Sequence, residues 1–207
     1  MKKENPWEHI ALQEYESHMG LKSVKQLQGL NESMARQLNS YPVSSVMILG
    51  VAGGNGLEHV RSNQFEKVYG VDVNAKYLKA CRKRYAYLGE TLVTIHTDLQ
   101  NPETILPSAK LLIANLLIEY IGYENFKRAV KQTDATYVSC VIQKNEEESF
   151  VSESEYLHTF DNLSEVHREI DEEGLNEVMQ QMGYHNVKTI RMDMPNGKQL
   201  IQLDYKK

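Results

Sequence analysis

The chain has 207 residues and a formal net charge of −5, with 41% hydrophobic and 25% charged residues. This length allows one domain with a full hydrophobic core, and the acidic balance argues against a protein that binds nucleic acid through phosphate contacts. The longest apolar stretch, residues 111–118, is too short to span a bilayer, and the N-terminus lacks the apolar core of a signal peptide. We therefore expect one domain, 1–207, of a cytoplasmic protein with no membrane partner.

Residues 1–42 have a helical pattern. Apolar residues recur at spacings of three and four from Val24 to Leu38, and Pro42 follows the end of this pattern. We expect this segment to form an N-terminal helical cap.

Strand and helix patterns then alternate through residues 43–143. The apolar runs predict strands at 44–50, 67–73, 91–98, 109–116 and 135–143. The amphipathic segments between them predict helices at 56–63, 75–88 and 123–132, the second capped by Asn74 and ending at Gly89. This alternation indicates a doubly wound α/β fold, in which helices cover both faces of a parallel sheet.

The C-terminal part, 169–207, differs from this pattern. It contains a helix at 172–183 and two strand-like runs, 185–194 and 198–205, joined at Pro195-Asn196-Gly197. The last strand should therefore enter a seven-stranded, mostly parallel sheet in the antiparallel direction. The preceding segment, 144–168, is long and acidic and follows the carboxyl end of a strand, so we expect it to be a lid insertion.

The glycine-rich stretch MILGVAGGNGLEHV, residues 47–60, joins the first strand to the first helix. Gly54 and Gly56 allow unusual backbone angles and close approach of a ligand, and a helix that opens at Leu57 would direct its N–H groups toward a carboxylate or phosphate. The spacing matches neither G-x-G-x-x-G nor a P-loop. A tight turn without a ligand is the alternative interpretation.

Polar residues end three of the predicted strands. Asp72 could accept both hydroxyls of a ribose, or cap the following helix. Asp98 could accept a hydrogen bond from an exocyclic amine such as adenine N6, with the Leu99 N–H beside it, or form a turn before Pro102. Asn115 lies in an apolar run and needs a hydrogen-bonding partner.

Taken in order, the glycine loop, these polar residues and the reversed last strand resemble a class I S-adenosylmethionine-dependent methyltransferase over residues 43–205. The resemblance implies the Rossmann-like methyltransferase fold with the N-terminal helices as a lid, and S-adenosylmethionine as cofactor with S-adenosylhomocysteine as product. The resemblance implies that Asp72 and Val73 bind the ribose and that Asp98 and Leu99 bind the adenine. It also implies that the methionine end of the cofactor is bound by the glycine loop, with Asn115 and Leu116 beside it. The loop residues are Gly50, Val51, Ala52, Gly54, Asn55, Gly56 and Leu57.

The loop departs from the usual D/E-x-G-x-G-x-G pattern of this family. The acid position is Gly50 and the first glycine position is Ala52. Backbone carbonyls near Gly50 and the side chain of Asn115 are the candidate substitutes for the missing carboxylate. With EYESHM upstream and VSESEY downstream, this loop form resembles a poorly characterised subgroup of bacterial small-molecule methyltransferases, in which it is normal.

Methyl transfer needs alignment and at most one base, so neither a triad nor a metal cluster is expected. Irregular spacing speaks against a metal site at His158, Glu165, His167 and Glu169, and the distant Cys81 and Cys140 are expected to be free thiols. The catalytic candidates are His18 as a general base, or else a surface histidine, together with Glu119 and Tyr120 after the fourth strand. The substrate candidates are Tyr15, Met19 and Tyr156, with ordinary packing as the alternative.

The resulting hypothesis is an S-adenosylmethionine-dependent methyltransferase with a small-molecule acceptor. A non-catalytic cofactor-binding or regulatory protein is the alternative, and the Gly50 substitution favours it. A nicotinamide-dependent oxidoreductase is disfavoured by the missing G-x-G-x-x-G and by the terminal hairpin. No nucleic-acid partner is expected, and the sequence is compatible with a monomer or a homodimer.

Overall fold

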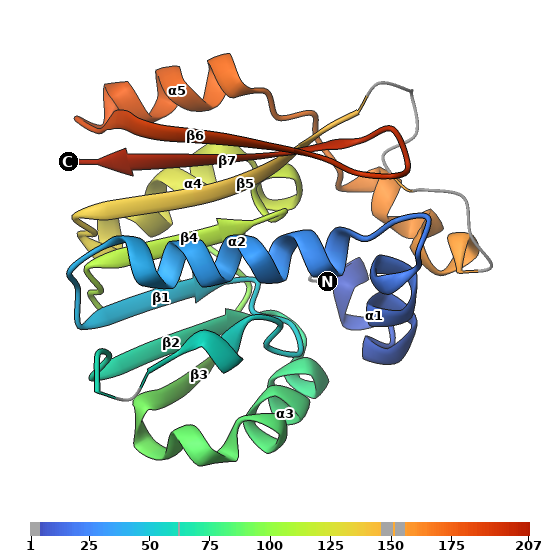
Figure 1. Ribbon diagram of the computed structural model, residues 1–207, viewed down its shortest axis with the longest axis horizontal. Coiled ribbons are helices and arrows are strands. Elements are labelled where there is room, and N and C mark those ends of the chain that lie inside the picture. The colour runs from blue at the N-terminus through green and yellow to red at the C-terminus, as the bar shows by residue number, and fades with distance from the viewer. Residues whose placement is uncertain (1–4, 62, 146–150, 152–155) are drawn as a thin grey trace.

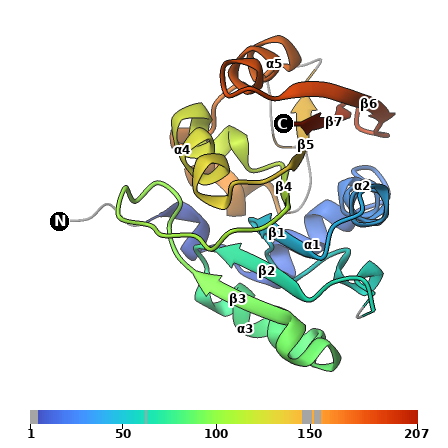
Figure 2. The same cartoon turned by 90° about the vertical axis from the view of Figure 1, so that its left-hand side faces the viewer.

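The computed structural model describes residues 5–61, 63–145, 151 and 156–207. They form one seven-stranded sheet in the order β3-β2-β1-β4-β5-β7-β6, with helices on both faces (Figures 1 and 2). The strands are β1 (Ser45–Leu49), β2 (Lys67–Asp72), β3 (Leu92–His96), β4 (Leu111–Asn115), β5 (Tyr137–Lys144), β6 (His185–Asp193) and β7 (Gln199–Lys206). The α-helices are α1 (Leu12–Gly20), α2 (Gln26–Ser40), α3 (Ala75–Arg84), α4 (Ile118–Thr133) and α5 (Glu172–Gln181).

Four short 3-10 helices complete the described elements: η1 (Pro6–Glu8), η2 (Leu57–His59), η3 (Ala86–Thr91) and η4 (Leu157–Glu165). The residues 146–150 and 152–155 of the expected lid, 144–168, lie outside the described part of the chain. The described part of that segment contains the short helix η4.

The first five strands are parallel, whereas β7 is antiparallel to both β5 and β6. The turn between β6 and β7 contains Gly197 at φ 74°, a left-handed conformation that glycine adopts without strain. The predicted fold class, a doubly wound sheet with a reversed last strand, is therefore confirmed.

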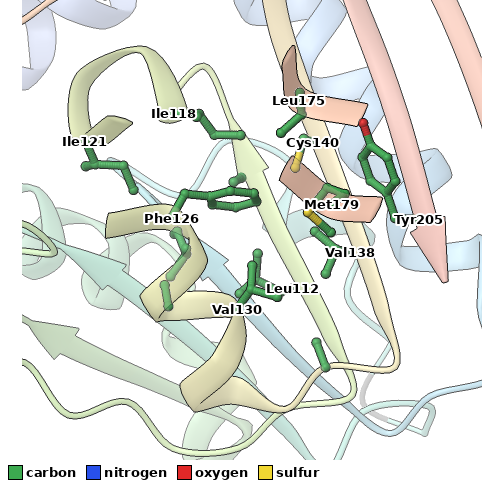
Figure 3. Close-up of a cluster of buried hydrophobic side chains, with 14 of the residues drawn as sticks. Leu112, Ile118, Ile121, Phe126, Val130, Val138, Cys140, Leu175, Met179 and Tyr205 are labelled. Carbon is green, nitrogen blue, oxygen red and sulfur yellow. The ribbon is translucent and has the colours of Figure 1, made fainter. Parts of the chain in front are cut away.

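The two faces of the sheet bury alternate residues of each strand, as a pleated backbone requires. On one face, Met47 and Leu112 pack beneath α4 and α5. Figure 3 shows this cluster, in which Phe126 of α4 and Met179 of α5 converge on Val138 of β5.

The opposite face buries Val46 and Ile48 beneath α2 and α3. Met34 and Leu38 of α2 belong to this cluster, so α2 is part of the hydrophobic core. Figure 2 shows α2 on the side of the sheet opposite α4. The Asn74 side chain accepts hydrogen bonds from the N–H groups of Lys76 and Tyr77 and caps α3 as predicted.

The helix predicted at 56–63 is wrong. Among the described residues of this range, Leu57–His59 form the short helix η2, and Val60 is already extended (φ −68°, ψ 122°). The face that a crossover helix would cover is occupied by α2: a Cβ on Gly56 would lie 2.4 Å from Cβ of Met34. The expected helix N-terminus at Leu57, with its directed N–H groups, is therefore absent from this loop.

The helices of the described residues include none with the length and apolar character needed to cross a bilayer.

Candidate active site

A cavity opens at the carboxyl ends of the strands, where the sheet order reverses between β1 and β4. Such a switch point is the usual ligand site of doubly wound sheets. The cavity, counted with its open mouth, has a volume of about 730 Å³. Eight of the predicted cofactor residues line it: Gly50, Ala52, Asp72, Val73, Asp98, Leu99, Asn115 and Leu116.

Asp72 ends β2 and lies 9% exposed at the centre of this edge. Its Oδ2 accepts a hydrogen bond from the Ala52 N–H at 2.9 Å, and its Oδ1 accepts one from the Asn74 N–H at 2.8 Å. Burial raises the pKa of the Asp72 carboxyl above its ordinary value, and the backbone N–H groups oppose that rise. Asp72 therefore ties β2 to the glycine loop and presents an acceptor to the cavity.

Two residues with strained backbone angles line this cavity. Ala52 (φ 47°) and Leu116 (φ 50°) are two of the four non-glycine residues with positive φ in the described part of the chain, and both line the cavity. Such residues cost about 1–3 kcal/mol each and cluster at binding sites. The strain supports a functional role for this edge.

The rest of the glycine loop turns away from the cavity. Val51 and Leu57 are buried in the core beneath α2, and a Cβ on Gly54 would lie 2.6 Å from the Tyr85 ring. Asn55 donates to the Leu27 carbonyl at 2.8 Å and accepts from Asn31 at 3.0 Å. These residues hold the loop against α2 and α3, whereas the resemblance had placed them on the cofactor.

Gly50 cannot be replaced by the acid of the usual family pattern without strain. Its φ is 68°, and a Cβ there would lie 3.1 Å from Cδ1 of Leu117. We expect Gly50→Glu to lower the free energy of unfolding by about 1–3 kcal/mol, measured by denaturant unfolding. The control is Gly183→Glu, because Gly183 has φ 83° but a Cβ there would meet no atom within 4 Å. Equal losses in the two variants would show that crowding at Leu117 is unimportant.

Asp98 and Asn115 both have partners within the protein. Asp98 Oδ1 accepts from the Gln100 N–H at 2.9 Å, so the turn-forming interpretation holds while the residue also lines the cavity. Asn115 forms a reciprocal amide pair with Gln37 of α2: its Oδ1 accepts at 2.9 Å and its Nδ2 donates at 3.0 Å. The partner that Asn115 was expected to need is thus a side chain of the N-terminal helices.

A second cavity of about 550 Å³ adjoins the first. Trp7, Tyr15, Leu116 and Tyr120 line both cavities and form the wall between them. The predicted catalytic and substrate residues that line the second cavity are Tyr15, His18, Met19, Glu119 and Tyr120. The structure therefore places these candidates beside the predicted cofactor residues.

Glu119 has the most unusual electrostatic environment of this group. It is 3% exposed, its Oε1 accepts from the Gln143 N–H at 3.0 Å, and its Oε2 has no hydrogen-bonding partner among the described residues. Burial raises the pKa of Glu119 to about 7. A carboxyl poised near neutral pH can both accept and donate a proton.

His18 is buried, 3% exposed, which rejects the surface-histidine alternative. Its ring packs against Phe160 at a centroid distance of 4.8 Å. Burial, with a further contribution from the charge of Lys198, lowers the pKa of His18, so the neutral imidazole is favoured. Burial likewise lowers the pKa of His167, which lines the same cavity.

Tyr156 lies outside the linings of both cavities and packs against the cluster of Ile10, Phe160 and Leu163, which agrees with the ordinary-packing alternative.

Both cysteines are free and buried. Among the described residues, no group of histidine, cysteine and acidic side chains could hold a metal ion.

The sequence prediction missed several residues of the site. Trp7 of η1 packs edge-on against Tyr15 and Tyr120 at centroid distances of 5.8 and 4.9 Å, and Phe160 lines the second cavity. Gln37 lies on the apolar face of α2 among buried residues, and a glutamine in that position is a signal that could have identified it.

No protein-family model and no curated protein sequence matches this chain. Solved structures match its fold. Magnesium protoporphyrin IX methyltransferase from Synechocystis, crystallised with S-adenosylhomocysteine, has a TM-score of 0.68 and 12% identity over 94% of this chain and 93% of that chain. A phosphoethanolamine N-methyltransferase from Haemonchus contortus, in complex with S-adenosylhomocysteine, has a TM-score of 0.67 and 12% identity over 95% of this chain and 56% of that chain.

A [4+2]-cyclase is also similar, with a TM-score of 0.65 and 10% identity over 89% of this chain and 82% of that chain. At such identities the likeness establishes the fold and leaves the reaction to be argued from the site. The chain has the class I methyltransferase fold, as the resemblance to that family implied. The resemblance to a particular bacterial subgroup stays a prediction.

Proposed function

We propose that the protein is an S-adenosylmethionine-dependent methyltransferase that acts on a small-molecule acceptor. The observation that carries the proposal is the convergence of Gly50, Asp72, Asp98 and Asn115 on one cavity at the switch point of the sheet. The cavity runs from β3 to β4 along the strand ends, which suits an elongated nucleoside ligand. The solved neighbours that hold S-adenosylmethionine or S-adenosylhomocysteine support the choice of cofactor.

The residues present fit this ligand. Asp72 offers a buried acceptor for ribose hydroxyls, and Asp98 with Leu99 offers a polar contact for the adenine edge. Gly50 and Ala52 bring backbone close to the cavity without a bulky side chain. When bound, S-adenosylmethionine supplies an electrophilic methyl group, and the chain supplies alignment and exclusion of water.

The second cavity is the proposed acceptor site. Its enclosure by Trp7, Phe160 and Leu163 suits a small molecule, and it shares a wall with the cofactor cavity. Glu119 or neutral His18 can take the proton that an acceptor O–H or N–H loses on methylation. This pair of proton acceptors beside the cofactor cavity supports catalysis over the non-catalytic alternative.

Trp7 gives a direct test of the cofactor site, because it is the only tryptophan of the chain and lines both cavities. We expect addition of S-adenosylhomocysteine to change the intrinsic tryptophan fluorescence with a saturable dependence on concentration, and calorimetry to give the same Kd. Trp7→Phe should remove the fluorescence signal while calorimetry still detects binding. Absence of binding to the unmodified protein at millimolar ligand would overturn the proposed function.

A further inference from the structure

The glycine loop has Gly50 at the position where the usual family pattern has an acidic residue. A buried carboxylate, Asp204, is connected to the cavity through other side chains. Asp204 of β7 is fully buried and accepts hydrogen bonds from three donors: Ser139 Oγ, Tyr41 Oη at 2.8 Å and Gln202 Nε2 at 3.0 Å. Arg36 is linked to this group through Gln202, whose Oε1 accepts from Arg36 Nε at 3.3 Å.

A chain of hydrogen bonds joins Asp204 to the cavity. Ser139, which lies opposite Asp204 in the β5–β7 register, donates to it and accepts from Gln37 Nε2 at 2.8 Å. The same Nε2 donates to Asn115 Oδ1 at 2.9 Å, and Gln37 Oε1 accepts from Asn115 Nδ2 at 3.0 Å. Gln37 and Ser139 are fully buried, and Asn115 lines the first cavity beside Gly50.

Asp204 fixes the direction of each hydrogen bond in the series from Ser139 to Asn115. The Asp204 oxygens accept from all three of their donors, so the single hydroxyl hydrogen of Ser139 points to Asp204. Ser139 can then only accept from Gln37, which orients the Gln37 amide and, through the reciprocal pair, the Asn115 amide. Without that constraint the two amides could flip together and present N–H groups where Asn115 now presents Oδ1.

We propose that Asp204, Ser139 and Gln37 are positioning residues that orient Asn115 Oδ1 toward the ammonium group of the cofactor, in place of the carboxylate missing at Gly50. The proposal rests on the proposed function. If adenosine lies at the β3 and β2 ends of the first cavity, the amino-acid end lies at the β1 and β4 ends, where Gly50 and Asn115 meet. The side-chain amide offers one remaining acceptor direction, which suits an ammonium donor.

The test compares S-adenosylhomocysteine with its deaminated analogue, in which hydrogen replaces the α-amino group. We expect the unmodified protein to bind S-adenosylhomocysteine at least about tenfold more tightly than the analogue in calorimetry, as for a hydrogen bond to a charged group. Ser139→Ala and Gln37→Leu should reduce this preference to about two- to threefold or less, mainly by lowering the affinity for S-adenosylhomocysteine. Asp204→Asn, which keeps the side-chain volume, should reduce it likewise.

Tyr41→Phe is the matched control, because it also removes one hydroxyl donor from Asp204 but lies off the path to Asn115. It should keep the preference for S-adenosylhomocysteine. If Ser139→Ala and Tyr41→Phe weaken both ligands equally, the network is only structural and the inference is overturned, although the proposed function stands. If the unmodified protein binds neither ligand, the proposed function itself is overturned.

Discussion

Asp72→Ala is expected to weaken the binding of S-adenosylhomocysteine by roughly 100-fold or more, measured by calorimetry. Two effects combine in this loss. The variant removes the proposed acceptor for the ribose hydroxyls, and it also leaves the N–H groups of Ala52 and Asn74 without the carboxylate that now binds them. Each hydrogen bond to a charged group contributes about 1.5–3 kcal/mol.

Binding of adenosine and 2′,3′-dideoxyadenosine separates these two effects. The unmodified protein should prefer adenosine, and Asp72→Ala should lose that preference. Asp98→Ala is the control, because it removes another carboxylate from the same cavity. It should weaken both nucleosides and keep the preference for adenosine. An unchanged preference in Asp72→Ala would mean that Asp72 only supports the loop.

Glu119→Gln is expected to stabilise the protein at alkaline pH. Burial raises the pKa of Glu119 from 4.5 to about 7, so the folded state binds the proton more tightly than the unfolded state does. The stabilisation linked to this proton is fully present below about pH 4.5 and is lost as the pH rises through about 7. Glutamine stays neutral and keeps an oxygen for the Gln143 N–H, so it escapes this loss.

The expected gain in the free energy of unfolding is about 3 kcal/mol at about pH 8.5 and falls toward zero at about pH 5. Denaturant unfolding at the two pH values measures it. Glu173→Gln, at an exposed glutamate of α5, should match the unmodified protein at both. A Glu119→Gln gain that is the same at both pH values would show that the carboxyl does not titrate in this range. If Glu119 is the base, the more stable variant should also be the less active one.

The sheet could be predicted from the sequence because each strand is a short apolar run bounded by turn residues. The parallel order then places Asp72, Asp98 and Asn115 at one edge, since the carboxyl ends of parallel strands meet there. The hairpin at Pro195-Asn196-Gly197 was visible for the same local reason: turn residues between two strand-like runs. Local patterns therefore sufficed for the fold and for the polar residues that the strands carry.

The wrong helix at 56–63 and the missed residues have a different origin. Whether a segment after β1 becomes helical depends on whether its face of the sheet is already covered, and α2 covers it through Met34 and Leu38. The places of Trp7 and Gln37 likewise depend on how the N-terminal helices dock on the strand ends. Such long-range packing leaves little trace in a local sequence pattern.

The docking of α2 also has a consequence for folding. In doubly wound domains the faces of the sheet are usually covered by helices that connect successive strands. Here α2 precedes β1, buries Val46 and Ile48 through Met34 and Leu38, and supplies Gln37 to the interior. Local unfolding of α2 would therefore expose Val46 and Ile48 of β1, and helix and sheet should open and close as a single cooperative unit.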